Sequence, residues 1–451
     1  MSVREIDANM LLAVLAANRG HQVLISDSSS VDTGLKKKLI APGIFHTKSL
    51  TPNDWKINKH KALKEKGFVI TSNDQEAGLS DIGYEENARI RFSEITISQA
   101  SAIFGWGEED VEILKEKYKK YSSKIFKTGS PRSDLWKSIF KDYWGKPSGI
   151  SDKPYLLVVS NMGLCDFRSF PERIQFLRDA GYDKRDPKAI ESEFKVKSDE
   201  YRRAYSFIEA INYIIKNNQN KFDIIFRPHP VEDIEGWKIL LKGMSNVKVI
   251  LEGSITKWVN NSFAVMHNGC TTAIEASISG KPVITYDPFN PPMHYGKFAN
   301  KLGHKISTLE DLLENTNLLF DNFINFKVQK YSDRQVDEEL SKKVYLDESE
   351  LAAEKIIKIW EDISNDDLSK SSNWKRLKWV LKVKDIRDTI RLKLKRLFPN
   401  KFSHIKEDLK FLPIDSQHTI ESFKKLKYIL KIDEKVECKF ISNRAILIKK
   451  P

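Results

Sequence analysis

The sequence contains little cysteine. Only Cys165, Cys270 and Cys438 occur in the 451 residues, and they are far apart. They provide neither a disulfide framework nor the closely spaced pairs that hold a structural metal ion. This excludes the class of small, disulfide-stabilised secreted proteins and fits a reducing cytoplasm.

Long hydrophobic runs are also missing. No segment approaches the roughly 20 apolar residues that cross a bilayer as a helix, although 40% of the chain is apolar. The early run MLLAVLAA is too short for a secretory signal and lacks a cleavage site. We therefore expect no secretory signal and no transmembrane helix, and a protein that works in the cytoplasm.

The basic charge of the chain is unevenly distributed. The net charge is +13, and residues 371–451 contain 22 Lys and Arg against 9 Asp and Glu, which accounts for all of it. Residues 1–370 are therefore neutral overall, which disfavours a main body that binds nucleic acid. We expect the basic charge to belong to an appendage, and no nucleic-acid partner.

The basic region opens with NWKRLKWVLKVKDIRDTIRLKLKRLF. Apolar residues form a helical stripe among the Lys and Arg of this segment: Leu377, Leu381, Ile386, Ile390, Leu394 and Leu397. Such a basic amphipathic helix suits an anionic membrane surface. The alternative is a basic helix packed on the body or on another protein. We expect a peripheral position at the inner face of the cytoplasmic membrane.

Strand-like and helix-like segments alternate through the first 365 residues, which favours βα units and parallel sheets. The expected strands are QVLIS, GFVITS, SAIFGW and KIFKTG, then PYLLVVSN, FDIIFRPHP, VKVILEG, FAVMHNG and KPVITYDP. A loop rich in proline and glycine near residues 145–154 marks a boundary. The fold class is therefore α/β and GT-B-like: two Rossmann-like domains, 1–148 and 149–368, facing a cleft, and a basic helical appendage, 369–451.

The first domain begins with a helix and not with a strand. The segment REIDANMLLAVLAANRG has the pattern of an amphipathic helix and starts almost at Met1. Either the first strand of the domain is missing or its sheet begins elsewhere.

An arginine and a histidine lie at the exit of a buried strand. In FDIIFRPHPVEDIEGW, residues 224–226 indicate a strand of a parallel sheet. Arg227 and His229 each precede a proline, which restricts their backbone to extended geometry. Their side chains are thus oriented in advance at the carboxyl end of a strand, where open α/β sheets bind ligands. The alternative is a turn that only terminates the strand.

A second candidate site follows the strand FAVM. In HNGCTTAIEASISGKPVITY a glycine loop leads into a helix, whose first amides lack intrahelical partners and attract anions. Thr271 and Thr272 add hydroxyl donors, so we expect this loop to hold a phosphate. The alternative is that Thr272 and Glu275 form a capping box that only starts the helix.

The two motifs together predict one phosphate site. The ends of strands in a doubly wound sheet line one edge, so His229 and loop 270–272 can face the same phosphate. A rigid imidazolium and helix-terminal amides would stabilise negative charge on a departing nucleotide phosphate. No Asp-X-Asp pair occurs at a strand end, so we expect leaving-group catalysis without a metal or a cofactor.

The other half of such a reaction needs a carboxylate. Asp74 and Glu76 follow GFVITS at the end of a strand of the first domain, and either could act as general base or nucleophile. An acidic turn is the alternative. In TGSPRSDLW, Arg132 could bind an acidic sugar or pair with Asp134, and a purely structural turn is the other interpretation.

Seven motifs occur in order over residues 3 to about 300. They are VREIDANMLLAVLAANRGHQV, NDQEAGL, FGWGEED, TGSPRSDL, FRPHP, EGSITKWV and HNGCTTAIEASISGKPVITY. As a set they resemble bacterial surface-carbohydrate biosynthesis proteins, GT-B-type glycosyltransferases similar to the β-Kdo transferases of capsule, lipopolysaccharide and O-antigen assembly. The resemblance implies two Rossmann-like domains, a CMP-activated 2-keto sugar acid as donor, and no metal. It does not cover residues 371–451.

The resemblance also assigns residues. His229 matches the family's His-Pro motif, which binds the CMP phosphate, and residues 74–78 match its acidic segment only loosely, because Gln75 and Ala77 interrupt it. We prefer Glu76 to Asp74 as the catalytic carboxylate, and consider Arg132 and Arg227 for the carboxylate of the sugar. The predicted nucleotide-binding and phosphate-binding residues are Arg227, His229, Ser254, Asn268, Gly269, Cys270, Thr271, Thr272 and Glu275.

The expected partners are a nucleotide sugar and a glycan acceptor that is lipid-linked. The first alternative function is a CMP-sialic-acid or other nonulosonate transferase, which would use the same phosphate site. The others are a CDP-glycerol-type phosphotransferase and a non-catalytic binder of carbohydrate or nucleotide.

Overall fold

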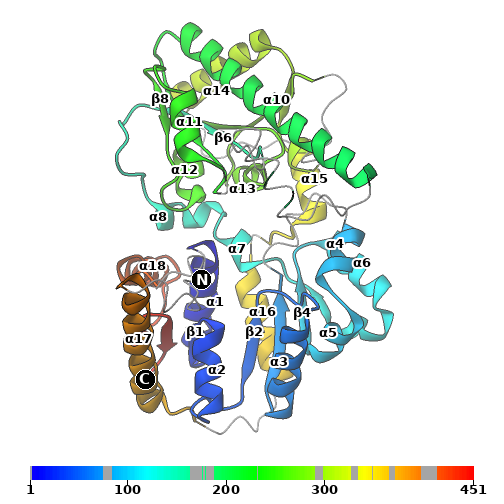
Figure 1. The fold of residues 1–451 in the computed structure, drawn as a ribbon, viewed down its shortest axis with the longest axis vertical. Coiled ribbons are helices and arrows are strands. Elements are labelled where there is room, and N and C mark those ends of the chain that lie inside the picture. Colours follow the sequence, from blue (N-terminus) through cyan, green and yellow to red (C-terminus); the bar gives the residue numbers. More distant parts are fainter. Residues whose placement is uncertain are drawn as a thin grey trace. The chain divides into compact units, whose positions relative to one another are not determined.

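The structure is a computed structural model in which the chain forms two compact units. It describes residues 3–74, 84–162, 175, 178, 187–230, 232–289, 298–326, 334–347, 349–364, 371–397 and 414–451. The first unit combines Met1–Tyr143 with Ser341–Pro451, and the second is Trp144–Leu340 (Figure 1). The predicted boundary after residue 148 is close to the observed one. The predicted limit at 368 differs, because the chain returns to the first unit at Ser341.

The first unit contains a parallel sheet with the strand order β2-β3-β4-β5. Its strands are β2 (Ile44–Thr47), β3 (Val69–Asn73), β4 (Ala102–Gly105) and β5 (Ile125–Lys127). The last three lie where GFVITS, SAIFGW and KIFKTG predicted them. The sheet begins at β2, a strand that the sequence did not predict.

The predicted strand QVLIS belongs to a different sheet. It forms β1 (Val23–Ser26), which pairs antiparallel with β13 (Ala445–Lys449), and β13 pairs with β12 (Glu437–Ser442). The C-terminal region therefore supplies two strands to a three-stranded sheet of the first unit. The prediction of a helical appendage is wrong for this segment, because backbone pairing integrates it into the unit.

Helices surround both sheets of the first unit. They are α1 (Val3–Asn18), α2 (Ser28–Lys36), α3 (Asp54–Glu65), α4 (Tyr84–Arg91), α5 (Glu94–Gln99), α6 (Glu108–Lys117), α7 (Pro131–Asp134), α16 (Ala352–Ile363), α17 (Trp374–Leu397) and α18 (Ser416–Ile429). The predicted amphipathic helix, α1, is buried on all sides, as Leu11, Val14 and Ala16 illustrate. It packs against α16, α18 and β1 and so forms the centre of the unit. Two short 3-10 helices (Lys119–Lys124 and Ser138–Phe140) and α8 (Lys141–Trp144) precede the second unit.

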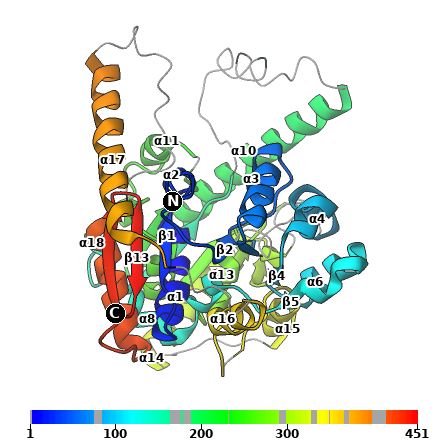
Figure 2. The same cartoon turned by 90° about the horizontal axis from the view of Figure 1, so that it is seen from below.

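The apolar residues of α17 divide between two faces. Leu377 and Leu381 are buried against the hairpin of β12 and β13 and against Leu39. Ile386 and Ile390 are more than half exposed. The predicted single stripe is therefore wrong, since residues 377 and 386 lie nine positions apart and point to opposite sides of an α-helix. Figure 2 shows the last turns of α17 reaching beyond β13. Among the described helices, none has the length and apolar character needed to span a bilayer.

A titratable contact fastens α18 to α1. The buried carboxylate of Asp7 accepts a hydrogen bond from Tyr143 Oη at 2.6 Å, and its Oδ1 lies 3.0 Å from His418 Nε2. This bond to Asp7 raises the pKa of His418, and the nearby carboxylates of Asp415 and Glu421 act in the same direction. A histidine whose pKa is raised on folding stabilises the native state below its unfolded pKa of about 6.5 and stops doing so as pH rises through the folded pKa.

We expect the contribution of His418 to the stability of the first unit to fall by about 1 kcal/mol or less between pH 6.5 and 8.5, because His418 is partly exposed. The buried His46 and His60 act in the opposite direction, because burial lowers the pKa of each to about 4 while their unfolded forms are partly protonated near pH 6.5. Urea unfolding at a series of pH values measures the change. His418→Gln keeps a donor without the titration, so the parent should lose stability relative to this variant as pH rises. A difference between the two proteins that does not change with pH would contradict the assignment.

The second unit contains one six-stranded parallel sheet. Its order is β11-β10-β9-β6-β7-β8. The strands are β6 (Tyr155–Val159), β7 (Asp223–Arg227), β8 (Val247–Val249), β9 (Ala264–His267), β10 (Val283–Tyr286) and β11 (His304–Ile306). The first five were predicted and β11 was not. Numbered along the chain, the order reads 3-2-1-4-5-6, which is the Rossmann arrangement.

Helices cover both faces of this sheet. Those of the second unit are α10 (Pro187–Asn217), α11 (Ile234–Leu240), α12 (Ile255–Asn261), α13 (Thr272–Ile278) and α14 (Leu309–Phe326), with a 3-10 turn (Ala299–Lys301), and α15 (Arg334–Lys343) runs across the boundary of the units. One core contains Phe207 of α10 and Leu312 of α14, and the other contains Trp258 of α12 and Ala273 of α13. Two Rossmann-like units are thus confirmed, and the cleft between them stays a prediction.

Candidate nucleotide-binding site

The topology of the second unit singles out one edge of its sheet. The strands β6 to β8 run outward in one direction and β9 to β11 in the other, so the order reverses between β6 and β9. Open α/β sheets bind ligands outside the carboxyl ends of the strands at such a switch point. Residues 160–161 follow β6 there, and loop 268–271 follows β9. His229 follows β7, the other neighbour of β6.

The loop that carries His229, which we call the His229 loop, is hydrogen-bonded to Ser160 at the end of β6. The backbone N–H of His229 donates to Ser160 Oγ at 3.2 Å, and the carbonyl of His229 accepts from the N–H of Glu232 at 2.9 Å. His229 is half-buried. Its backbone is therefore held on both sides, in addition to the restriction that the flanking prolines impose.

Glu232 is the centre of this loop. Its buried carboxylate accepts from Ser160 Oγ at 2.5 Å, from the N–H of Met162 at 2.7 Å and from Trp237 Nε1 at 2.9 Å. Burial raises the pKa of Glu232, while these donors oppose the shift. Sequence reasoning did not identify Ser160 or Glu232. The signal available was an acidic residue three positions after the histidine and a polar pair directly after a buried strand.

The loop after β9 is fastened to the same strand end. Asn161 Nδ2 donates to the carbonyl of Gly269 at 2.7 Å, and the N–H of Gly269 donates to Asn300 Oδ1 at 2.7 Å. Gly269 has a φ of +74°, which favours glycine. Ser160 and Asn161 thus link the His229 loop to the glycine loop. The two predicted motifs lie on either side of one strand end.

Neighbouring side chains give the glycine loop its shape. His267 Nδ1 accepts from the N–H of Cys270 at 3.2 Å, and its Nε2 lies 3.0 Å from Thr285 Oγ1. Burial lowers the pKa of His267 to about 3, so it is neutral. Asn268 is buried and donates to the carbonyl of Tyr286 at 2.8 Å. Asn268, Gly269 and Cys270 therefore have identifiable structural contacts, and their binding of a nucleotide stays a prediction.

The capping box considered for the start of α13 does not form. The residue that precedes the helix is Thr271, which makes no side-chain cap. Glu275 instead accepts a hydrogen bond from Thr256 Oγ1 on α12, and Thr256 also accepts from Ser254 Oγ at 3.3 Å. Thr272 is buried, with its Oγ1 3.3 Å from Cys270 Sγ. Glu275 and Ser254 thus belong to one polar group between two helix starts.

Arg227 supports the loop after β8. Its guanidinium donates to the carbonyls of Glu252 at 2.7 Å and Gly253 at 2.5 Å, and lies 6.0 Å from the ring of Trp258. These bonds fix the backbone just before Ser254. The geometry gives Arg227 a positioning role, and a contact with phosphate or with the sugar carboxylate stays a prediction.

The two candidate carboxylates of the first unit differ in what the structure describes. Asp74 is buried, and Arg91 donates a hydrogen bond to each of its carboxylate oxygens, from Nε at 2.6 Å and from Nη2 at 2.7 Å. The carbonyl of Asp74 accepts from Trp106 Nε1 at 2.6 Å. Glu76 lies outside the described residues. The carboxylate of Asp74 is engaged by Arg91, and a catalytic role for Glu76 stays a prediction.

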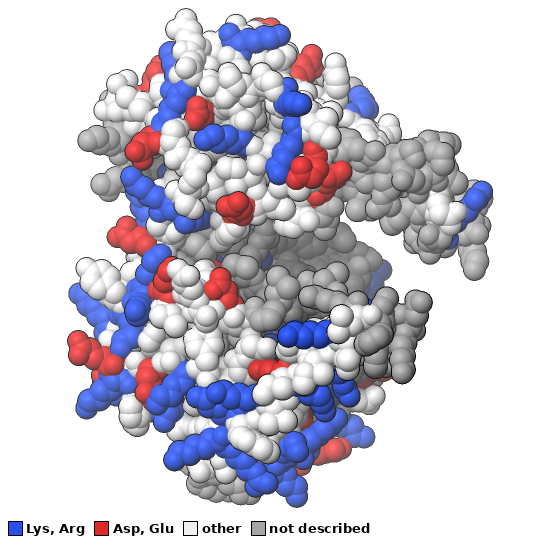
Figure 3. All heavy atoms as spheres, turned by 60° about the vertical axis from the view of Figure 1, so that its left-hand side comes forward, with Lys and Arg blue, Asp and Glu red and all other residues white. Residues whose placement is uncertain are grey.

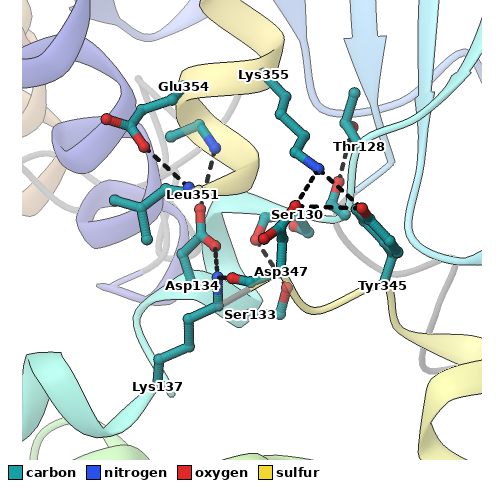
Figure 4. Close-up of polar contacts among 12 residues, drawn as sticks. Thr128, Ser130, Ser133, Asp134, Lys137, Tyr345, Asp347, Leu351, Glu354 and Lys355 are labelled. Carbon is teal, nitrogen blue, oxygen red and sulfur yellow. Dashed lines mark hydrogen bonds and ion pairs between the residues drawn. The ribbon is translucent and has the colours of Figure 1, made fainter. Parts of the chain in front are cut away.

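The segment TGSPRSDL holds the chain where it returns to the first unit (Figure 4). Asp134 accepts from the N–H of Ala353 at 3.0 Å and pairs with Lys137 at 3.0 Å, and burial raises its pKa. Gly129 has a φ of +83°, and a Cβ there would lie 2.7 Å from the carbonyl oxygen of Tyr345. Together these contacts anchor the start of α16, as expected for a structural turn.

Arg132 lies on the same segment. Its guanidinium lies 5.3 Å from the ring of Trp136, within the range of a cation–π contact. Asp134, the partner considered for it, is engaged by Lys137 and by α16. Binding of a sugar carboxylate by Arg132 stays a prediction. No group of His, Cys, Asp or Glu among the described residues is arranged to hold a metal ion.

Comparison with known proteins gave structural likenesses only. No family model and no curated protein matches the sequence. A UDP-GlcNAc 2-epimerase from Methanocaldococcus jannaschii is 16% identical with a TM-score of 0.42, covering 74% of this chain and 80% of that one. S. aureus MnaA, in a co-structure with UDP, is 13% identical with a TM-score of 0.38 and 81% of each chain covered. The wall teichoic acid polymerase TagF is 10% identical with a TM-score of 0.39, covering 66% and 69%.

Proposed function

We propose that the protein is a glycosyltransferase that moves a 2-keto sugar acid, Kdo or a relative, from a CMP-activated donor to a surface-glycan acceptor. The observation that carries the proposal is the linkage of the His229 loop and the glycine loop through Ser160 and Asn161 at the switch point of a Rossmann sheet. A nucleotide phosphate is the ligand that such an edge binds.

The chemistry follows from the charge that develops during transfer. The acceptor oxygen bonds to the anomeric carbon while the bond from that carbon to the phosphate oxygen breaks, and the electron pair leaves with CMP. A protonated imidazole at His229 and backbone amides of the glycine loop would stabilise this charge. We keep Glu76 as the base that takes the proton of the acceptor hydroxyl. No metal is required in this scheme.

The acceptor in this proposal is a lipid-linked glycan, and the protein acts at the inner face of the cytoplasmic membrane without spanning it. The basic α17 supports this part of the proposal through its charge and its exposed apolar residues.

Thermal shift with CMP, CDP, UDP and GDP tests the site. A ligand that binds only the native state raises its stability. Of the four nucleotides, saturating CMP should therefore give the largest rise in the melting temperature of the second unit, about 5 °C or more. His229→Ala should abolish the shift, whereas His304→Ala, on the edge strand β11, should keep it. A shift that survives in His229→Ala would contradict the proposal. Turnover of labelled CDP-alcohols in place of a CMP-sugar would instead establish a phosphotransferase.

A further inference from the structure

Helix α17 carries a second apolar face whose side chains are exposed in the part of the first unit that the structure describes. Exposed side chains form it, at 47% to 70% of their full accessibility: Trp379, Val383, Ile386, Ile390 and Leu397. Their spacing of four, three, four and seven residues places them on one narrow stripe of the helix. We call this stripe the outer face. It points away from Leu377 and Leu381, which fasten the helix to the unit.

Basic residues flank the outer face on both sides. The helix contains ten Lys and Arg and two Asp. At 100° per residue, Lys382 and Lys393 lie along one side of the stripe, and Arg387 and Arg391 along the other. Figure 3 shows Lys and Arg gathered over the lower part of the molecule, where α17 lies in Figure 1.

The two acidic residues lie on the inner side of α17. Asp385 accepts from the N–H of Asn443 at 3.0 Å, and Asp388 pairs with Lys384 at 3.3 Å. Asp388 Oδ1 also lies 3.7 Å from Arg387 Nε. Both Asp lie away from the apolar stripe, so the outer face combines this stripe with a net excess of positive charge on its flanks. This is the pattern of a helix that lies in the plane of a membrane interface, with its apolar side immersed and its cations at the headgroups.

We propose that the outer face of α17 binds a bilayer surface that contains anionic lipids. Each Lys or Arg near such a surface adds attraction, and a tryptophan is a preferred side chain at the depth of the headgroups. A second copy of the chain does not fit, because it would bring the basic flanks of the two outer faces against each other. A nucleic acid would leave five large apolar side chains without a partner. The inference rests on α17 alone and specifies the membrane contact of the proposed function.

Vesicle flotation of the full chain tests the inference. We expect binding to vesicles of phosphatidylcholine mixed with phosphatidylglycerol and little binding to phosphatidylcholine alone, and weaker binding as salt is raised. Ile386→Ser with Ile390→Ser should lower the partition constant tenfold or more, because two apolar side chains lose their burial. Lys382→Gln with Lys393→Gln should lower it about fivefold per lysine.

The matched control is Ile95→Ser with Ile139→Ser. These isoleucines are 55% and 54% exposed in the same unit, so the pair removes equal apolar surface elsewhere. The control should bind as the parent does. Equal binding by the Ile386 and Ile390 variant, with its melting temperature unchanged, would overturn the inference. Loss of a dimer in that variant, measured by sedimentation without vesicles, would also overturn it and assign the face to a second copy. CMP thermal shift is unaffected by either result, so the transferase proposal is tested separately.

Discussion

Glu232→Ala should destabilise the second unit by about 3 kcal/mol or more and abolish CMP binding. The substitution removes the acceptor of Ser160 Oγ, of the Met162 N–H and of Trp237 Nε1 at once. A buried donor left without a partner costs about 1–3 kcal/mol. Ser160 then loses the group that orients its hydroxyl toward the N–H of His229. Urea unfolding measures the first effect and CMP thermal shift the second.

Glu232→Gln should weaken the network of Glu232 without removing it. An amide keeps one oxygen acceptor, so one of the N–H donors, Met162 or Trp237, loses its partner whichever way the amide turns. We expect a loss of about 1–3 kcal/mol and a reduced CMP shift. Ser160→Ala should reduce the CMP shift as well, while leaving the bonds of Glu232 to Met162 and Trp237 in place. The variant that combines Glu232→Gln with Ser160→Ala should lose less of the CMP shift than the sum of the two single losses, because both residues belong to one hydrogen-bond network.

The control for these variants is Glu235→Ala. Glu235 is exposed on α11 and pairs with Lys238 at 2.8 Å, so its removal should change stability by less than about 0.5 kcal/mol. Full CMP binding by Ser160→Ala would refute the role of the Ser160–Glu232 pair in positioning His229. If Glu232 only stabilises the fold, CMP affinity should be unchanged in every Glu232 variant that still folds.

The sequence predicted the central strands of the second unit most clearly, and it missed β2, β11, β12 and β13. Residues 155–159 and 224–226 are continuous apolar runs, which identify central strands of a parallel sheet. The missed strand β2 contains His46 and Thr47, and its four residues are only half-buried. β11 has three residues and lies at the sheet edge. Neither carries a periodicity that distinguishes a strand from a loop.

Long-range pairing explains the largest error in the fold. The strand at Val23 was predicted, but its partner at Ile448 lies more than four hundred residues away. A local pattern shows that a segment is a strand and not which strand it joins. The excess of Lys and Arg in residues 371–451 suggested a separate appendage. This prediction failed because the charge of a segment does not determine which strand its backbone pairs with.

The site was predicted at the level of loops and not of contacts. The motifs around His229 and Gly269 lie on either side of the end of β6, as the strand-edge argument required. Ser160 and Asn161, which join the loops, end a segment that was read only as a strand. Arg227 turns to the carbonyls of Glu252 and Gly253, because the neighbouring loop offers acceptors that no sequence window contains.

Arg91→Ala should destabilise the first unit by about 3–5 kcal/mol. The substitution leaves the carboxylate of Asp74 buried without its cation, and such an uncompensated charge costs more than the intact pair contributes. Asp74 is 3% exposed, and its backbone carbonyl is also fixed by Trp106. Urea unfolding measures the loss. Lys115→Ala, at an exposed position on α6 of the same unit, should change stability by less than about 0.5 kcal/mol.

The same variants bear on the choice between the two carboxylates. Arg91→Ala with Asp74→Asn removes the charge together with its partner, so most of the stability should return, as it does when both members of a buried ion pair are replaced. If Asp74 serves only to fix the chain just before Glu76, this double variant should also regain transfer from a CMP-sugar. If Asp74 is the base, the double variant folds and stays inactive, and the preference for Glu76 is wrong.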